Sequence, residues 1–158
     1  MRVSVAMIVA VLAGGNATFA VAQHQHKHDS SAPRAQDARQ FVRFPAALVE
    51  NTLANMRDHL LALQEIQSHL GMGHTDVAAR IAETRLGLSS LGLHGAAHVS
   101  KYMPQGMQDA GTAMHRAASR FAITTQDAGV TGDMKPVFAG LADITAQCVG
   151  CHAGYRLK

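Results

Sequence analysis

Apolar residues recur at helical spacing from Pro45 onward. The first such run alternates steps of three and four, with the polar Gln67 in one slot. This spacing predicts an amphipathic helix over about residues 45–70, because it places the apolar side chains on one face. Pro45 suits the first turn, and Gly71 with Gly73 suits the end. The stripe consists of Val49, Leu53, Met56, Leu60, Leu63 and Leu70.

Two more stripes follow. Thr75 or Asp76 caps a second predicted helix that reaches about Leu91, with an extension through Val99 left open, although Gly92 and Gly95 interrupt it. Its stripe is Val77, Ile81, Thr84, Leu88 and Leu91. A third helix begins near Pro104 and ends before Gly129. Its stripe is Met107, Gly111, Met114, Ala118 and Phe121.

The fourth stripe belongs to a helix that starts after Asp133, a good N-cap residue. It consists of Val137, Leu141, Ile144, Cys148, Cys151 and Tyr155. Four amphipathic segments, short turns after the first and third, and no strand pattern predict an all-α protein, an antiparallel four-helix bundle.

The fourth stripe also carries the most specific motif, Cys148-Val149-Gly150-Cys151-His152. Two cysteines three apart, followed directly by histidine, form the spacing at which a protein takes two thioether bonds to haem and coordinates its iron. Because both sulfurs fall on the apolar stripe, we expect the porphyrin inside the bundle, near the C-terminal end. The motif therefore predicts a c-type cytochrome with one covalent haem c.

Three other interpretations of the cysteine pair each lack a feature. A thioredoxin-like redox pair would stand in a βαβ pattern, and a zinc site would need further cysteines beyond the two in this chain. A structural disulfide gives no role to His152.

The N-terminus has the features of a secretory signal over residues 1–22. Arg2 supplies a positive start, an apolar run follows, and Ala20-Val21-Ala22 forms a cleavage site before Gln23. The alternative is a retained membrane anchor, but the run is shorter than a membrane span. We expect cleavage after Ala22, no stable membrane anchor afterwards, and a periplasmic protein.

The predicted mature chain divides into a flexible, His-rich leader over residues 23–40 and a cytochrome domain over residues 41–158. The leader has no apolar periodicity, and its His24, His26 and His28 favour either a solvated linker or a weak site for copper, nickel or zinc. His94 and His98, spaced i, i+4, would share a helix face, although a surface or propionate-contacting role fits them better. Metal handling through these histidines is a third class of function.

Composition limits the partners. Hydrophobic residues make up 47% of the chain and charged residues 16%, which is enough for one core. The net charge is +3, with scattered basic residues, two tyrosines and no tryptophan. These features argue against nucleic acid. We expect redox partner proteins, although no concentrated charge marks where they dock.

The C-terminal block Cys148 to Arg156 matches the C-x-x-C-H-x-x-Y-R ending of the cytochrome c′ family, the class II c-type cytochromes. The resemblance covers about residues 41–158, but outside this block it rests on helix count and order. It implies Cys148 and Cys151 as thioether anchors, His152 as proximal ligand, and Tyr155 and Arg156 beside the haem. It leaves open a homodimer through the first two helices.

In the resembled family, the first helix supplies the residue on the far side of the iron. Methionine there implies a six-coordinate electron-transfer protein, and a bulky apolar residue implies five-coordinate haem that binds gases. Met56 lies about where that residue would fall, so we expect single-electron transfer with His152 and Met56 as axial ligands, and no enzyme activity. A core-filling Met56 is the alternative, and with it a nitric oxide or carbon monoxide protein. We expect His59 at the surface, core or connection roles for Met103, Met107 and Met114, and no role for His69, His74 or His115.

Overall fold

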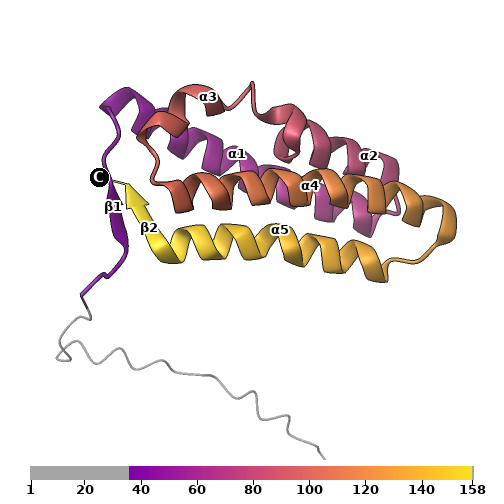
Figure 1. Ribbon diagram of the computed structural model, residues 1–158. Helices are drawn as coiled ribbons and strands as arrows, with labels where there is room; N and C mark the ends of the chain where they lie inside the picture. The colour runs from indigo at the N-terminus through magenta and orange to yellow at the C-terminus, as the bar shows by residue number, and fades with distance from the viewer. Residues whose placement is uncertain (1–35, 158) are drawn as a thin grey trace, which may run out of the picture. The chain divides into compact units, whose positions relative to one another are not determined.

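The computed structural model describes residues 36–157, and these are mostly helical, which confirms the all-α class (Figure 1). The predicted signal peptide, its cleavage after Ala22 and the leader up to residue 35 lie outside the described residues. Within residues 36–157, no helix is long and apolar enough to span a membrane. The α-helices are α1 (Ala46–Gly71), α2 (Thr75–Ile81), α3 (Ala96–Val99), α4 (Gln105–Thr131) and α5 (Lys135–Gly154). Shorter turns are the π-helical η1 (Ala82–Leu86) and the 3-10 segments η2 (Leu88–Ser90) and η3 (Ser100–Tyr102).

The long helices begin and end close to their predicted bounds. Pro45 and Pro104 directly precede α1 and α4, where the missing N–H of proline costs no helical hydrogen bond. Gly132 ends α4 with a φ of 76°, a left-handed conformation that favours glycine, so α4 runs slightly beyond its predicted end before Gly129. In Figure 1, α5 runs alongside α4, and α2 packs against both α1 and α4.

The second predicted helix is wrong beyond Leu86. The chain leaves the helix at Gly87, which is extended, and then forms η2 and a turn at Gly95, with a φ of 60°. Glu83 stabilises this break, because its carboxylate accepts hydrogen bonds from the backbone N–H and the hydroxyl of Ser89. The segment between η1 and α3 is therefore irregular where the stripe predicted a continuous helix.

Most of the core lies in one cluster, which we call the closed end. It is built largely from alanines, which let helices approach closely, with a few large side chains between them. Phe121 of α4 is 1% exposed and contacts Gly140 of α5, where an added Cβ would lie 3.3 Å from the ring. The buried members are Ala62, Leu63, Ile66, Ala78, Ala79, Ala82, Leu86, Met114, Ala117, Ala118, Phe121, Ala122, Ala128, Val137 and Ile144.

A smaller buried cluster lies at the opposite end of these helices, which we call the cavity end: Val42, Phe44, Leu48 and Val99. Here β1 (Gln40–Val42) and β2 (Tyr155–Leu157) form a parallel pair, with Phe41 opposite Arg156. The prediction of no strands is wrong at this point, because three-residue strands are too short to produce an alternating pattern. The pair joins the start of the described chain to the residues after the cysteine motif.

Parts of the predicted stripes face solvent. Leu60 is 70% exposed and Leu53 is 44% exposed, and Thr84 and Leu88 of the second stripe are also exposed. The buried face of α1 instead carries Leu48, Thr52, His59, Ala62, Leu63 and Ile66. The stripes of α4 and α5 are correct, with Phe121, Val137 and Ile144 fully buried.

Candidate functional site

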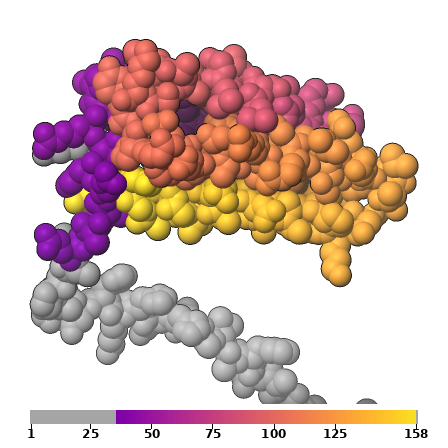
Figure 2. Space-filling model, viewed as in Figure 1, coloured from indigo at the N-terminus to yellow at the C-terminus, as the bar shows by residue number. Residues whose placement is uncertain are grey.

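A cavity of about 560 Å³ occupies the cavity end. Its walls come from α1, the segment from Leu91 to Met103, α4, and the chain from Cys151 to Leu157. Figure 2 shows a hollow between the segment around α3 and the first turns of α4, with purple atoms of α1 at its floor. The apolar lining includes Val49, Leu53, Met56, Leu91, Val99, Met103, Met107, Met114 and Leu157.

The cysteine motif reaches this cavity through the last turns of α5. Cys151 and His152 line the cavity, whereas half-buried Cys148 packs against the closed end. The two cysteines form no disulfide. Burial raises the pKa of both thiols, and the neighbouring Cys148 raises that of Cys151 further. The predicted inward-facing register of the cysteines is therefore confirmed.

Met56 projects into the same cavity from α1. Its side chain is 37% exposed, and α1 also contributes Thr52 and His59, four residues before and three after Met56. Residues at these spacings share one helix face. The structure thus brings Met56, Cys151 and His152 to one cavity, as the sequence predicted.

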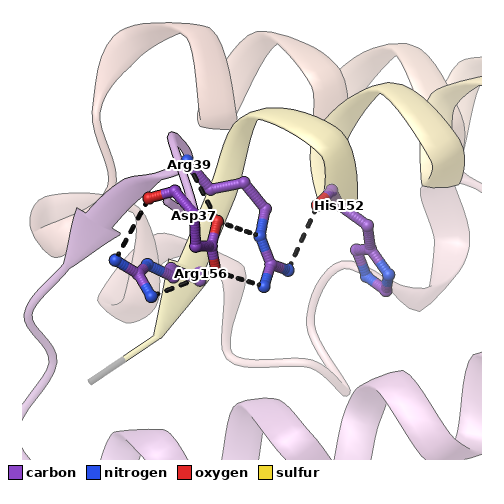
Figure 3. Close-up of polar contacts among 4 residues, drawn as sticks. All are labelled: Asp37, Arg39, His152 and Arg156. Carbon is purple, nitrogen blue, oxygen red and sulfur yellow. Dashed lines mark hydrogen bonds and ion pairs between the residues drawn. The ribbon is translucent and has the colours of Figure 1, made fainter. Parts of the chain in front are cut away.

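Arg39 and Arg156 stand together at the rim, joined by Asp37 (Figure 3). The Asp37 carboxylate accepts hydrogen bonds from Arg39 Nε at 3.0 Å and Nη2 at 2.8 Å, and pairs with Arg156 Nη1 at 3.0 Å. The hydrogen bond from the Arg39 side chain holds the pKa of Asp37 well below its usual value. Arg39 Nη1 also donates to the backbone oxygen of His152 at 3.4 Å, while the imidazole of His152 points away from the group (Figure 3).

Arg156 and Tyr155 lie on β2 and line the cavity. The Arg156 guanidinium lies 3.6 Å from the centre of the Phe41 ring, a cation–π contact that fixes its plane. Arg156 Nε is buried and has no hydrogen-bond partner in the structure. An arginine held this way at a cavity rim has a donor available for a carboxylate.

Sequence reasoning missed a cluster of three histidines on the cavity wall. His59 Nε2 lies 3.4 Å from His94 Nδ1, and the ring centres of His94 and His115 are 5.6 Å apart. The surface position expected for His59 is wrong, because it is 9% exposed on the face that α1 buries. His115, expected to have no role, is 7% exposed and follows the inward-facing Met114.

Burial, with smaller contributions from the neighbouring His94 and His115, lowers the pKa of His59 to about 4. The pKa of His94 is also lowered, mainly by burial. The signal in the sequence was that His59 lies three residues after Met56, on the same helix face.

His94 and His98 do not share a helix face as a pair. His94 precedes α3 and lines the cavity, whereas His98 lies within α3 and contacts Tyr102. Gly95 separates them with its left-handed conformation. Among residues 36–157, no three histidine, cysteine, aspartate or glutamate side chains are grouped to hold a metal ion.

No family model, curated protein or solved structure matches this chain. The site is therefore judged on its residues alone. They fit a haem group: two inward-facing thiols three residues apart, an adjacent histidine, an apolar cavity, and two arginines at its rim that suit propionates. A haem needs only His152 as an imidazole ligand, so the lack of a three-ligand group does not conflict with it.

Proposed function

We propose that this chain is an exported, periplasmic c-type cytochrome that passes single electrons between redox partner proteins. In this proposal the helices form an antiparallel four-helix bundle around one covalent haem, and the protein turns over no substrate. The observation that carries it is the position of Cys151 and His152, the last two residues of the cysteine motif, at a cavity of about 560 Å³ with a largely apolar lining. A well-packed domain leaves few voids larger than a water molecule, so a cavity of this size has room for a bound group.

Each site residue has a role in the proposal. The Cys148 and Cys151 thiols form the thioether bonds, and His152 holds the iron on one side. Met56 supplies a thioether sulfur on the other side, a soft ligand that raises the reduction potential. Haem supplies an iron that changes its charge by one electron, and the apolar wall excludes water from it.

The rim residues hold the anionic edge of the group. Arg156 is fixed by Asp37 and Phe41 and keeps its Nε unpaired, which suits a propionate. Arg39 donates a hydrogen bond to the backbone oxygen of His152, which ties the rim to the end of α5. Tyr155 lines the cavity between them.

The alternative proposal is a five-coordinate haem protein that binds nitric oxide or carbon monoxide. Its support is the polar wall of His59 and His94, which an electron-transfer site does not need. Metal handling through the leader has no such support, since His24, His26 and His28 lie outside the described residues.

The test is haem staining of the exported protein after denaturing electrophoresis. Covalent haem should give a peroxidase-stainable band in the wild type and none in a Cys148→Ala/Cys151→Ala variant, which is the matched control. A wild-type protein that is exported but does not stain would overturn the proposal.

Optical spectra then separate the two candidates. Low-spin spectra that become high-spin in Met56→Ala support methionine ligation and electron transfer. A high-spin spectrum in the wild type, unchanged by that substitution, supports the gas-binding alternative.

A further inference from the structure

The cavity wall carries a hydrogen-bonded group that the proposed electron transfer does not use. It consists of His59, His94, Ser90 and His115, which we call the histidine network. Its members come from α1, η2, the turn before α3, and α4, and its three histidines line the cavity. Polar groups placed this deep in an apolar wall cost free energy unless they are paired.

Two members have their protons fixed by carbonyl groups. His115 Nδ1 lies 2.7 Å from the backbone oxygen of Leu86, which can only accept, so this nitrogen carries the hydrogen. The Ser90 hydroxyl donates to the backbone oxygen of Gly87 at 2.7 Å. Its oxygen lies 3.4 Å from His115 Nδ1 and 3.5 Å from His94 Nδ1.

His59 and His94 together have one N–H donor more than they use between them. Two neutral imidazoles carry two N–H groups, and one of these lies between His59 Nε2 and His94 Nδ1. The other belongs to His59 Nδ1 or His94 Nε2, depending on the tautomer. Within residues 36–157, neither of these nitrogens has a hydrogen-bond partner.

The His59 and His94 rings are neutral at neutral pH, so each carries one N–H group. Burial lowers the pKa of His59 to about 4 and also lowers that of His94. The charged groups nearest the pair are Asp58 and Arg85, and they neutralise each other in an ion pair. Thr52, on the same wall, has a buried hydroxyl with no hydrogen-bond partner.

We propose that the histidine network donates a hydrogen bond to a small anion, of the azide or nitrite kind, that binds the haem iron opposite His152. The inference rests on the proposed haem attachment and deepens it by naming a ligand class. An anion satisfies the spare N–H, which the surrounding methionine, leucine and valine side chains cannot do. Binding is an exchange in which the Met56 sulfur leaves the iron and the anion takes its place, with no change of oxidation state.

The test is azide binding to the ferric holoprotein, followed by absorbance in a Met56→Ala background that opens the iron. His59→Leu should weaken azide binding about tenfold, which corresponds to ~1.4 kcal/mol. His59→Gln keeps an N–H donor and should retain most of the affinity. His98→Leu is the matched control, because His98 does not line this cavity and should leave the affinity unchanged.

His94→Leu provides a second variant on the more exposed ring, in case His59→Leu does not fold. Equal azide affinity in the parent, His59→Leu and His94→Leu proteins would overturn the inference, and so would equal losses in His59→Leu and His59→Gln. Haem staining comes before any azide is added. Absence of covalent haem would show that the proposed function has failed, and would be recognised before the network is tested.

Discussion

The closed end and the cavity end of the same helices are packed in opposite ways. At the closed end, alanines bring α2, α4 and α5 together around Phe121, Ile144 and Val137 with little space between them. At the cavity end, the same α4 and α5, with α1, surround about 560 Å³ lined by methionines, histidines and the cysteine motif. The closed end holds the helices together so that the cavity end can stay open for a bound group.

The largest expected difference is between the losses of stability caused by two substitutions to alanine. Both are made in a Cys148→Ser/Cys151→Ser background that takes no covalent haem. Phe121→Ala should lower the free energy of unfolding by about 3–5 kcal/mol, because it empties a closed space. Leu53→Ala should cost less than about 1.5 kcal/mol, because Leu53 is 44% exposed and already borders the cavity. Urea unfolding measures both. Equal losses would mean that the two ends are equally packed.

Acid should weaken the cavity end through His59. The pKa of His59 falls from 6.5 to about 4 on folding, so the unfolded chain binds the proton more tightly. Stability should therefore be full above pH 6.5 and fall as the pH drops towards 4, by up to ~3 kcal/mol. In the haem-free background, His59→Leu should flatten this part of the profile. An unchanged slope would show that His59 does not cause it.

Replacing glycine by alanine, once at each end of the helices, tests the difference in packing between the cavity end and the closed end. An added Cβ at Gly111, at the cavity end of α4, meets nothing within 4 Å, so Gly111→Ala should stabilise the haem-free chain by about 0.5–1 kcal/mol. At Gly140 the Cβ would lie 3.3 Å from the Phe121 ring, so Gly140→Ala should gain less. Thermal unfolding would contradict the contrast if Gly140→Ala gained more than Gly111→Ala.

The smallest effect should come from the ion pairs that connect α1 to η1. Arg85 binds both Asp58 and Glu65, and its hydrogen bond holds the pKa of Asp58 below the usual value. Asp58→Asn should cost less than ~1 kcal/mol, because the carboxylate is 44% exposed and screened by solvent. A lowered carboxyl pKa stabilises above about pH 4 and is lost below it. A loss that persisted at pH 3 would point to packing instead.

The sequence predicted the closed end well where large apolar residues mark the stripe, as in α4 and α5. It failed on α1, because Leu60, Leu61 and Leu63 are equally apolar and do not single out one face. It failed again on the second helix, because most buried positions of α2 and η1 are alanines and because Gly87 ends the helix after Leu86. Where neighbouring positions on a helix are equally hydrophobic, as in runs of alanine or leucine, the sequence does not show which side of the helix is buried.

The candidate site was predictable as far as local spacing reached. Cys151, His152 and Met56 lie on one cavity, because the position of each is fixed by the register of a single helix. The histidine network and the position of Arg39 at the rim were not predicted, because they assemble from distant segments. Arg39 contacts a residue 113 positions away, a distance that no helical or strand period encodes.

The strand pair at the cavity end also has a consequence for the order in which this chain can become rigid. Tyr155–Leu157 are synthesised more than a hundred residues after their partners Gln40–Val42. The pairing therefore has to wait until the chain has been made as far as Leu157, while the local turns of α1 and α4 can form beforehand. Until that late event the stretch that carries Cys148 and Cys151 has no fixed neighbour at its C-terminal side, and it is open to any catalyst that must reach both thiols.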